Sequence, residues 1–193
     1  MPIPDMLSGL YGINRKKEAM LYYLYMMCDG EVSYSEEKVF NKICNDLKIE
    51  KKDVEEVITD CRVLAPDPES AFSVIVREKI EENVINQWFG ISNKSERARI
   101  IWNLLNLGYA DTRFSENEKK IVSYIVRKWN IDDNVYQEMV DTSETMLALV
   151  KQKEWLLKTF FKDKERDEKE KIIDNEIDKM FTDITITIEE LKD

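Results

Sequence analysis

Histidine is absent from this chain of 193 residues, and glycine, proline and cysteine are scarce. The absence of histidine removes the commonest general base near neutral pH, the commonest transition-metal ligand and the usual activator of serine and cysteine nucleophiles. Five glycines and four prolines are too few for a fold rich in strands and tight turns. The sequence therefore predicts an all-α protein that is not an enzyme.

Three cysteines, Cys28, Cys44 and Cys61, form no CxxC pair, and their odd number argues against a disulfide scaffold. We interpret Cys28 and Cys44 as small core residues. The longest apolar run covers residues 19–28 and is too short to span a bilayer. No basic residue precedes Arg15, so the charged start of a secretory signal is lacking. We therefore predict a cytoplasmic protein with no direct membrane insertion.

The chain is strongly acidic, with a formal net charge of −10 at pH 7 and a pI of about 4.8. Hydrophobic residues make up 43% of the sequence and charged residues 35%, a balance typical of a globular protein with a real core. A nucleic-acid-binding protein usually has a basic face, and an acidic chain repels phosphates. We therefore expect cations or basic protein surfaces as partners, and no nucleic acid.

An eight-residue signature occurs twice. The sequence DGEVSYSE at residues 29–36 returns as DTRFSENE at residues 111–118, with an offset of 82 residues. The same offset relates the apolar positions on both sides, so the repeat covers residues 19–62 and 101–144. An internal repeat of this length predicts two equivalent structural halves.

Apolar residues at helical spacing predict helices along most of the chain. Serine, asparagine or aspartate residues precede several of these segments and serve as helix-start signals. The predicted helices are 16–28, one that begins after Ser33, 51–62, one from Pro68 to Gly90, one after Asn93, one after Ser115, a short one around 136–140, one from Asp141, and one over 173–184.

We divide the chain into an N-terminal arm (residues 1–14), a helical body (15–150) and a helical C-terminal extension (151–193). The apolar stripe over residues 173–184 must bury against the body or against another copy of the chain. The alternation in residues 185–188 fits a short strand or an irregular end, and we predict the irregular end.

The repeated signature places a capping box at the start of a helix in each half. Ser33 and Ser115 can accept hydrogen bonds from the first free amides of the next helix, and Glu36 and Glu118 can reach back to the serine amide. Such caps stabilise a helix by about 1 kcal/mol each. Capping therefore explains the serines and the glutamates without a ligand.

Asp29 and Asp111 need a further explanation, because each lies near the C-terminus of a predicted helix, where negative charge is unfavourable. An Asx-type hydrogen bond to amides of the corner is one explanation. A cation held by the aspartate, a neighbouring glutamate and free helix-end carbonyls is the other, and such oxygen ligands suit Ca²⁺, Mg²⁺ or Mn²⁺. The candidate metal ligands are Asp29, Glu36, Asp111 and Glu118.

The second copy of the signature differs at its turn, where Thr112 replaces Gly30 and Arg113 replaces Glu31. A β-branched residue tolerates a left-handed cap poorly. Either the two corners differ in backbone conformation, or Gly30 does not adopt the left-handed conformation. Because Arg113 adds positive charge to the second corner, we expect the first corner to bind if only one of them holds a cation.

A hydrophobic helix that ends in Asp-Gly-Glu-Val-Ser-x-x-Glu, then a helix with Val39 and Ile43, then Leu47-Lys48-Ile49, resembles the tellurite-resistance TerB family and its relatives. One relative is the N-terminal domain of a membrane-anchored DnaJ-like co-chaperone, and residues 109–131 are similar to the second half of that domain. The resemblance covers residues 15–150. It implies a bundle of seven to nine helices in two pseudo-symmetric halves.

The resemblance also implies an acidic surface that binds metal, at the four candidate ligands, and a role in stress-response or membrane-associated assemblies. Our first hypothesis is a non-enzymatic module that acts by protein–protein contact in a stress-response or envelope-associated assembly. Its contact surfaces would be the 173–184 stripe, by which the C-terminal helix binds a partner or a second copy, and the tyrosine-rich first helix. The alternative is a divalent-cation-binding protein that uses the acidic corners.

Overall fold

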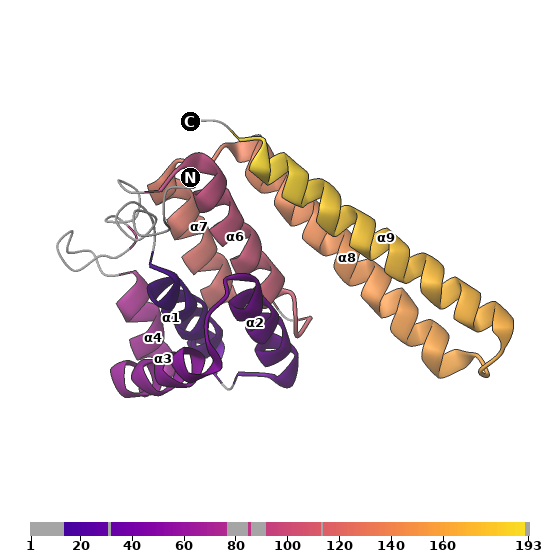
Figure 1. Cartoon of the computed structure of the whole chain (residues 1–193), viewed down its shortest axis with the longest axis horizontal. Helices are drawn as coiled ribbons and strands as arrows, with labels where there is room; N and C mark the ends of the chain where they lie inside the picture. Colours follow the sequence, from indigo (N-terminus) through magenta and orange to yellow (C-terminus); the bar gives the residue numbers. More distant parts are fainter. Residues whose placement is uncertain (1–13, 31, 77–84, 86–91, 113, 192–193) are drawn as a thin grey trace, which may run out of the picture. The chain divides into compact units, whose positions relative to one another are not determined.

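The structure is a computed structural model that describes residues 14–30, 32–76, 85, 92–112 and 114–191. These residues contain eight α-helices and one 3-10 helix, and no strand (Figure 1). The prediction of an all-α fold is confirmed. The chain divides into two compact units between Ile131 and Asp132, and each unit is described by itself.

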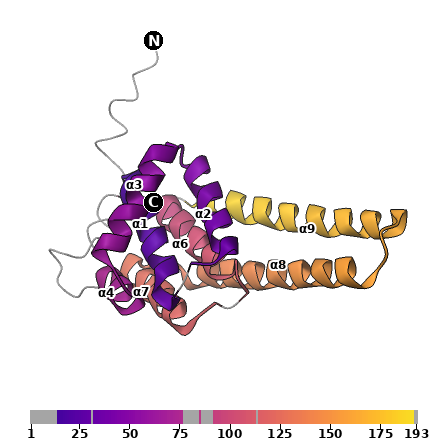
Figure 2. The ribbon, with the colours of Figure 1, turned by 90° about the horizontal axis from the view of Figure 1, so that it is seen from below.

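The first unit is a bundle of helices built around α1. Its elements are α1 (Arg15–Met26), the 3-10 helix η2 (Met27–Asp29), α2 (Tyr34–Asp46), α3 (Lys51–Leu64), α4 (Pro68–Ile75), α6 (Lys94–Gly108) and α7 (Glu116–Trp129). The central helix α1 contacts α2, α3, α4, α6 and α7, and Figure 2 shows it surrounded by them.

The tyrosines of α1 belong to the core of this bundle. Tyr22, Tyr23 and Tyr25 are all buried, because a helix that is apolar all round must be enclosed by its neighbours. The hypothesis that the tyrosine-rich first helix is a contact surface is therefore wrong. The three cysteines are also buried and free, as the interpretation of Cys28 and Cys44 requires.

An ion pair between the buried Glu18 and the partly exposed Arg99 joins α1 to α6. Arg99 donates to both carboxylate oxygens of Glu18, at 2.6 and 2.9 Å, and Glu18 also accepts from the Tyr22 hydroxyl at 2.5 Å. Asn103 Nδ2 donates to that hydroxyl at 3.0 Å. Burial lowers the pKa of Arg99 and the bonds to Glu18 raise it, and the net direction is upward. The carboxylate of Glu18 is thus compensated although it is fully enclosed.

The fourth helix starts as predicted and ends early. Asp67 Oδ1 accepts from the amide of Ser70 at 2.8 Å, and Pro68 occupies the first turn. The helix α4 ends at Ile75, not at Gly90, and Val76 has left the helical conformation, with φ −96° and ψ 21°. Residues 77–84 and 86–91, and residues 1–13 of the predicted arm, lie outside the described residues.

The second unit is an antiparallel hairpin of two long helices, α8 (Asp133–Thr159) and α9 (Lys164–Glu189), which pack side by side (Figures 1 and 2). The prediction of a short helix around 136–140 and a new one from Asp141 is wrong. Asp141 lies inside α8, where its carboxylate accepts from Gln137 Nε2 at 2.8 Å. No glycine or proline interrupts this stretch, and α8 also crosses residue 150 without a break.

The C-terminal stripe packs against α8 of the same chain. Ile173 and Ile184 are buried, and Lys153 of α8 forms ion pairs with Glu170 and Asp174 of α9. Residues 185–188 are helical, so the predicted irregular end is wrong. The helix persists because Ile184 and Ile188 are buried, although the hydroxyls of Thr185 and Thr187 bond back to carbonyls four residues earlier, which is slightly unfavourable in a helix.

Candidate functional site

The four predicted ligands lie at the ends of four elements in the first unit. Asp29 closes η2, and Asp111 lies three residues beyond the end of α6. Glu36 and Glu118 lie in the first turns of α2 and α7. We call these four residues the acidic corner.

Both predicted capping boxes are present, with the same geometry. The amides of Ser33 and Ser115 donate to Oε2 of Glu36 and Glu118 at 2.7 Å, and the two serine hydroxyls accept from the glutamate amides at 3.2 Å. Both glutamates are buried although each carries a carboxylate. One oxygen of each carboxylate is thus used for capping, which leaves the other oxygen of each for a different partner.

The two halves of the acidic corner meet. Asn117 of α7 donates to the carbonyl of Cys28 in η2 at 2.9 Å, which ties the start of one helix to the end of the other. Burial raises the pKa of Glu36, and the negative charges of Asp29 and Asp111 raise it further, against the hydrogen bonds from Ser33. The structure therefore brings the two copies of the signature, 82 residues apart in sequence, into one electrostatic neighbourhood.

Glu118 is the most perturbed carboxylate of the acidic corner. Burial raises its pKa from the ordinary 4.5 to about 7, and the charges of Asp29 and Glu36 add to the effect. The hydrogen bonds from Ser115 lower the pKa and only partly offset burial. Near neutral pH this group therefore gains from a proton or from another positive charge.

Tyr25 is a further member of this neighbourhood that the sequence analysis did not single out. Its hydroxyl is fully buried and has no hydrogen-bond partner among the described residues. Burial raises its pKa well above the ordinary value, and the charges of Glu118, Glu36 and Asp29 contribute. No sequence signal distinguishes this tyrosine from the other core tyrosines of α1.

Gly108 makes room for that hydroxyl. A Cβ atom at Gly108 would lie 2.5 Å from the Tyr25 hydroxyl oxygen and 2.7 Å from the Phe114 ring. Both distances are too short for unstrained contact, so a larger residue would displace the tyrosine or the phenylalanine. The glycine at the end of α6 is therefore a packing requirement of the acidic corner.

The two corners differ in backbone conformation, and Gly30 does not adopt the left-handed helical conformation, so both alternatives given for Gly30 and Thr112 hold. Gly30 has φ 134° and ψ −124°, a region that a side chain rarely allows. Thr112 has φ 70°, in the left-handed region, in spite of its β-branch. The two turns therefore present their aspartates from different backbones, although the capping boxes that follow are alike.

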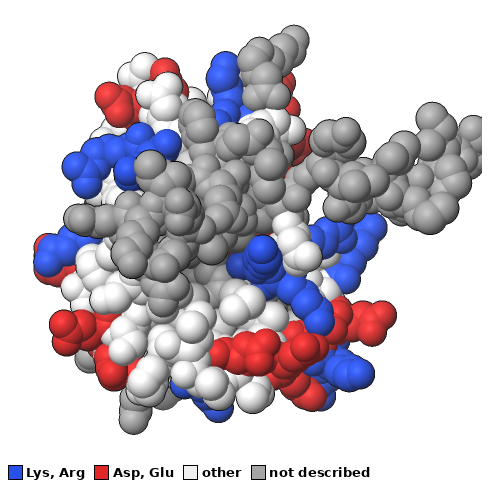
Figure 3. Space-filling view, turned by 90° about the vertical axis from the view of Figure 1, so that its left-hand side faces the viewer, with Lys and Arg blue, Asp and Glu red and all other residues white. Residues whose placement is uncertain are grey.

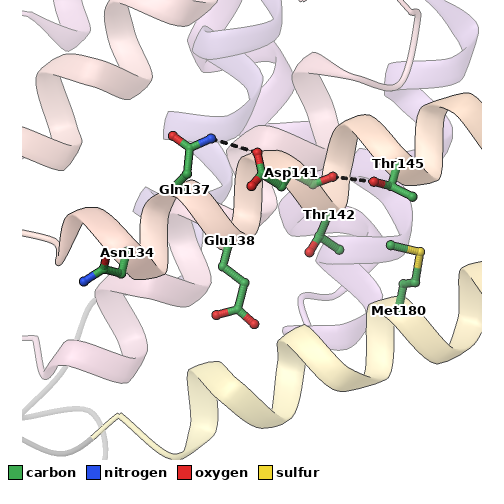
Figure 4. A pocket seen from close by; sticks show the side chains of 7 residues that line it. All are labelled: Asn134, Gln137, Glu138, Asp141, Thr142, Thr145 and Met180. Atoms are coloured by element: carbon green, nitrogen blue, oxygen red, sulfur yellow. Dashed lines mark hydrogen bonds between the residues drawn. The ribbon is translucent and has the colours of Figure 1, made fainter.

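The acidic corner is not a preassembled metal centre. Within the described ranges, no three aspartate, glutamate or cysteine side chains lie close enough together to hold a metal ion. A polar hollow of about 390 Å³ between α8 and α9 is a weaker candidate (Figure 4). There Glu138 points into the hollow, while Asp141 turns back to accept from Gln137.

Comparison with known families identifies the first unit and part of the hairpin. The family described as "Tellurite resistance protein TerB" matches residues 16–140. The chain belongs to the TerB family. No curated protein and no solved structure matches it. Among the described residues of this TerB-family chain, no helix is both long and apolar enough to cross a membrane.

A second candidate site lies on the hairpin, beyond the TerB match. Near the turn, α8 and α9 form a groove of about 340 Å³. We call it the tip groove, and its lining residues are Gln152, Trp155, Leu156, Phe160, Lys169, Ile172 and Ile173. Three of these large apolar side chains are exposed, Trp155 at 58%, Phe160 at 43% and Ile172 at 63%. Neighbouring Phe161 is 94% exposed.

Proposed function

We propose that this TerB-family protein is a non-enzymatic helical module that acts by protein–protein contact, in a stress-response or envelope-associated assembly. The observation that carries the proposal is the tip groove, where three large apolar side chains face solvent together. A contiguous exposed apolar surface of this kind is typical of an interaction site, whereas singly scattered exposed residues are ordinary. The description of the family, tellurite resistance, supports a stress-related setting.

The tip groove is held in shape before any partner binds. The rings of Trp155 and Phe160 contact edge to face, with centroids 5.5 Å apart. The ammonium of Lys169 lies 5.7 Å from the centroid of the Phe160 ring. Side chains that are already ordered lose less conformational entropy on binding, so aromatic anchors of this kind suit an interface.

Site-specific photocrosslinking in the source cells tests this proposal. A benzophenone amino acid replaces Ile172 in the groove, and in a matched control it replaces Val63, which is 80% exposed in the first unit. We expect a covalent adduct of defined mass from position 172 and only diffuse labelling from position 63. Equal labelling from both positions would contradict a contact function for the tip groove.

Divalent-cation binding at the acidic corner is a second candidate function. Two observations support it: four carboxylates from both halves share one neighbourhood, and the unpartnered Tyr25 hydroxyl is buried beside them. Oxygen donors of this type suit Ca²⁺, Mg²⁺ or Mn²⁺. The ligands would be Asp29, Glu36, Asp111 and Glu118, and the side chains must move together to bind, since no three of these described residues form a site as they stand.

Thermal unfolding with each metal tests the second candidate. A cation at about 100 times its dissociation constant stabilises the folded state by about 2.7 kcal/mol, which is easily measured. We expect the melting temperature to rise for the wild type and to stay unchanged for Asp29→Asn/Asp111→Asn. The control is Glu138→Gln, which removes a carboxylate from the hairpin hollow instead. The same rise in all three proteins would exclude the acidic corner as the site.

A further inference from the structure

The charge of the hairpin is divided sharply along its length. Residues 151–171, which we call the hairpin tip, hold eight lysines and arginines against six acidic residues, a net charge of +2. Residues 132–150 and 172–191, which we call the hairpin base, hold eleven acidic residues against a single lysine, a net charge of −10. Within this acidic hairpin the tip is thus the basic segment, and it supplies five of the seven residues that line the tip groove.

The hairpin tip also holds most of the exposed apolar surface of this unit. A two-helix hairpin buries one seam between its helices and leaves the outer faces to solvent, so apolar residues beside the seam need a further partner. Trp155 and Ile172 flank the buried Leu156 and Ile173 on the same side of the hairpin. The groove between two parallel ridges of this kind fits a third helix.

We propose that the occupant of the tip groove is the hairpin of a second copy of this chain, packed antiparallel to the first. The inference rests on the proposed contact function and names its partner. In this arrangement the tip of each hairpin lies along the base of the other, and the contact occurs twice by two-fold symmetry. The result is a four-helix bundle built from two hairpins.

Charge selects the antiparallel orientation. At physiological ionic strength interactions between exposed charges fade beyond about 8 Å, so only charges that face each other across the interface count. Antiparallel packing sets a +2 tip against a −10 base at both ends. Parallel packing would set the two −10 bases against each other, which is strongly unfavourable. Because the base takes up about two thirds of each helix, which has 27 residues in α8 and 26 in α9, the two bases overlap only over about the middle third of an antiparallel pair, whereas they overlap over their whole length in a parallel pair.

Sedimentation equilibrium of the full chain over a range of concentrations tests the dimer. We expect a reversible monomer–dimer equilibrium, and a dissociation constant at least about tenfold weaker for Trp155→Ala/Ile172→Ala, because buried aromatic anchors carry much of an interface's affinity. The control, Tyr34→Ala/Val63→Ala, removes two side chains of the first unit that are even more exposed, at 83% and 80%, and should leave the constant unchanged. A wild type that stays monomeric overturns the proposal. So does a control variant whose dimer is weakened as much as that of Trp155→Ala/Ile172→Ala.

Salt and charge reversal test the orientation. Raising the salt concentration should weaken an antiparallel dimer and strengthen a parallel one, since opposite charges face each other only in the first. Lys158→Glu/Lys162→Glu changes the net charge of the hairpin tip from +2 to −2. This variant should dimerise more weakly than the wild type and should lose most of the salt dependence. Tighter binding at high salt overturns the antiparallel arrangement.

A distance measurement distinguishes the two orientations directly. All three native cysteines are buried, so Lys158→Cys gives a single reactive site at the tip for a spin label. The antiparallel dimer should show labels more than about 30 Å apart, and a parallel dimer labels much closer together. If the chain is monomeric but position 172 still captures another protein or a membrane component, the second copy is excluded while the contact function stands. If the chain is monomeric and position 172 captures nothing, both the dimer and the contact function of the tip groove are excluded.

Discussion

The two units of this chain handle their charges and apolar residues in opposite ways. Residues 1–131 contain 21 acidic and 19 basic residues, and on the face shown in Figure 3 the two signs are interspersed. The hairpin concentrates its acidic residues at the base and its basic residues at the tip. The first unit buries most of its large aromatic side chains in a multi-helix core, with Tyr34 as an exposed exception, whereas the hairpin exposes Trp155, Phe160 and Phe161.

This difference separates two kinds of site. In the TerB unit, the unusual groups are buried charges and a buried hydroxyl, so their role depends on what neutralises them. On the hairpin, the unusual groups are exposed, so their role depends on what covers them. The first kind of site should respond to protons and cations, and the second to concentration and salt. Four sets of substitutions test this separation, from the largest expected effect to the smallest.

The largest effect should come from breaking the ion pair between Glu18 and Arg99 in the first unit. Arg99→Met leaves the Glu18 carboxylate enclosed without its partner and should lower the free energy of unfolding by about 3 kcal/mol. Urea denaturation measures the loss. Lys38→Met, at an exposed position, should change stability by less than about 0.5 kcal/mol. The double variant Glu18→Gln/Arg99→Met should recover part of the loss, and no recovery would mean that packing, not charge, is responsible.

The acidic corner should make stability depend on pH in a defined direction. The folded pKa of Glu118 is raised to about 7, so between about pH 4.5 and 7 the folded chain keeps a proton that the unfolded chain has released. The free energy of unfolding should therefore fall as the pH rises through this window, by about 2 to 3 kcal/mol. Glu118→Gln keeps the capping geometry and should remove most of this slope. A wild type that becomes more stable between about pH 5 and 7 would contradict the prediction.

A smaller effect should follow from filling the space at Gly108. Gly108→Ala places a methyl group against the Tyr25 hydroxyl and should cost about 2 kcal/mol in stability, measured by thermal or urea unfolding. Tyr25→Phe removes a buried hydroxyl that has no partner among the described residues, so it should be neutral or slightly stabilising. In the Tyr25→Phe background, Gly108→Ala should lower the free energy of unfolding by less than it does in the wild type. Equal costs in both backgrounds would show that Phe114 alone causes the clash.

The smallest effect on stability is expected at the exposed turn of the hairpin. Phe161→Ser at the hairpin turn removes a side chain that is 94% exposed, and should change the unfolding free energy of the monomer by less than about 0.5 kcal/mol. Unfolding at a concentration far below the dimer dissociation constant measures this. A loss above about 1 kcal/mol would mean that the phenylalanine is covered within its own chain, and the contrast between the two units would disappear.

Local signals in the sequence predicted local structure well. The capping boxes at Ser33 and Ser115 and the start of α4 after Asp67 depend only on residues three positions apart, and each is present. The extents of the helices were harder to predict. Asp141 and Glu144 resemble a helix start, yet α8 continues through them because a preceding helical turn already supplies the hydrogen bonds that a cap would replace.

The sequence predicted that the four carboxylates of the acidic corner lie near one another but not which groups surround them, and their role as metal ligands stays a prediction. The repeat identified the four carboxylates, and the structure brings them into one neighbourhood. Tyr25 and the Glu18–Arg99 pair depend on contacts between residues far apart in sequence, and the partners of the ion pair are separated by 81 positions. No local pattern encodes such pairings, so they became visible only when α1 and α6 were packed together.

The boundary of the TerB match falls inside a helix. The match ends at residue 140, whereas α8 begins at Asp133 and continues to Thr159. An α-helix grows by adding hydrogen bonds at its end, so length can be gained there without a linker and without changing the turns that precede it. The end of the family match therefore does not coincide with the end of a helix or with a domain boundary. Truncation of the chain at residue 140 would cut α8 within its continuous series of backbone hydrogen bonds.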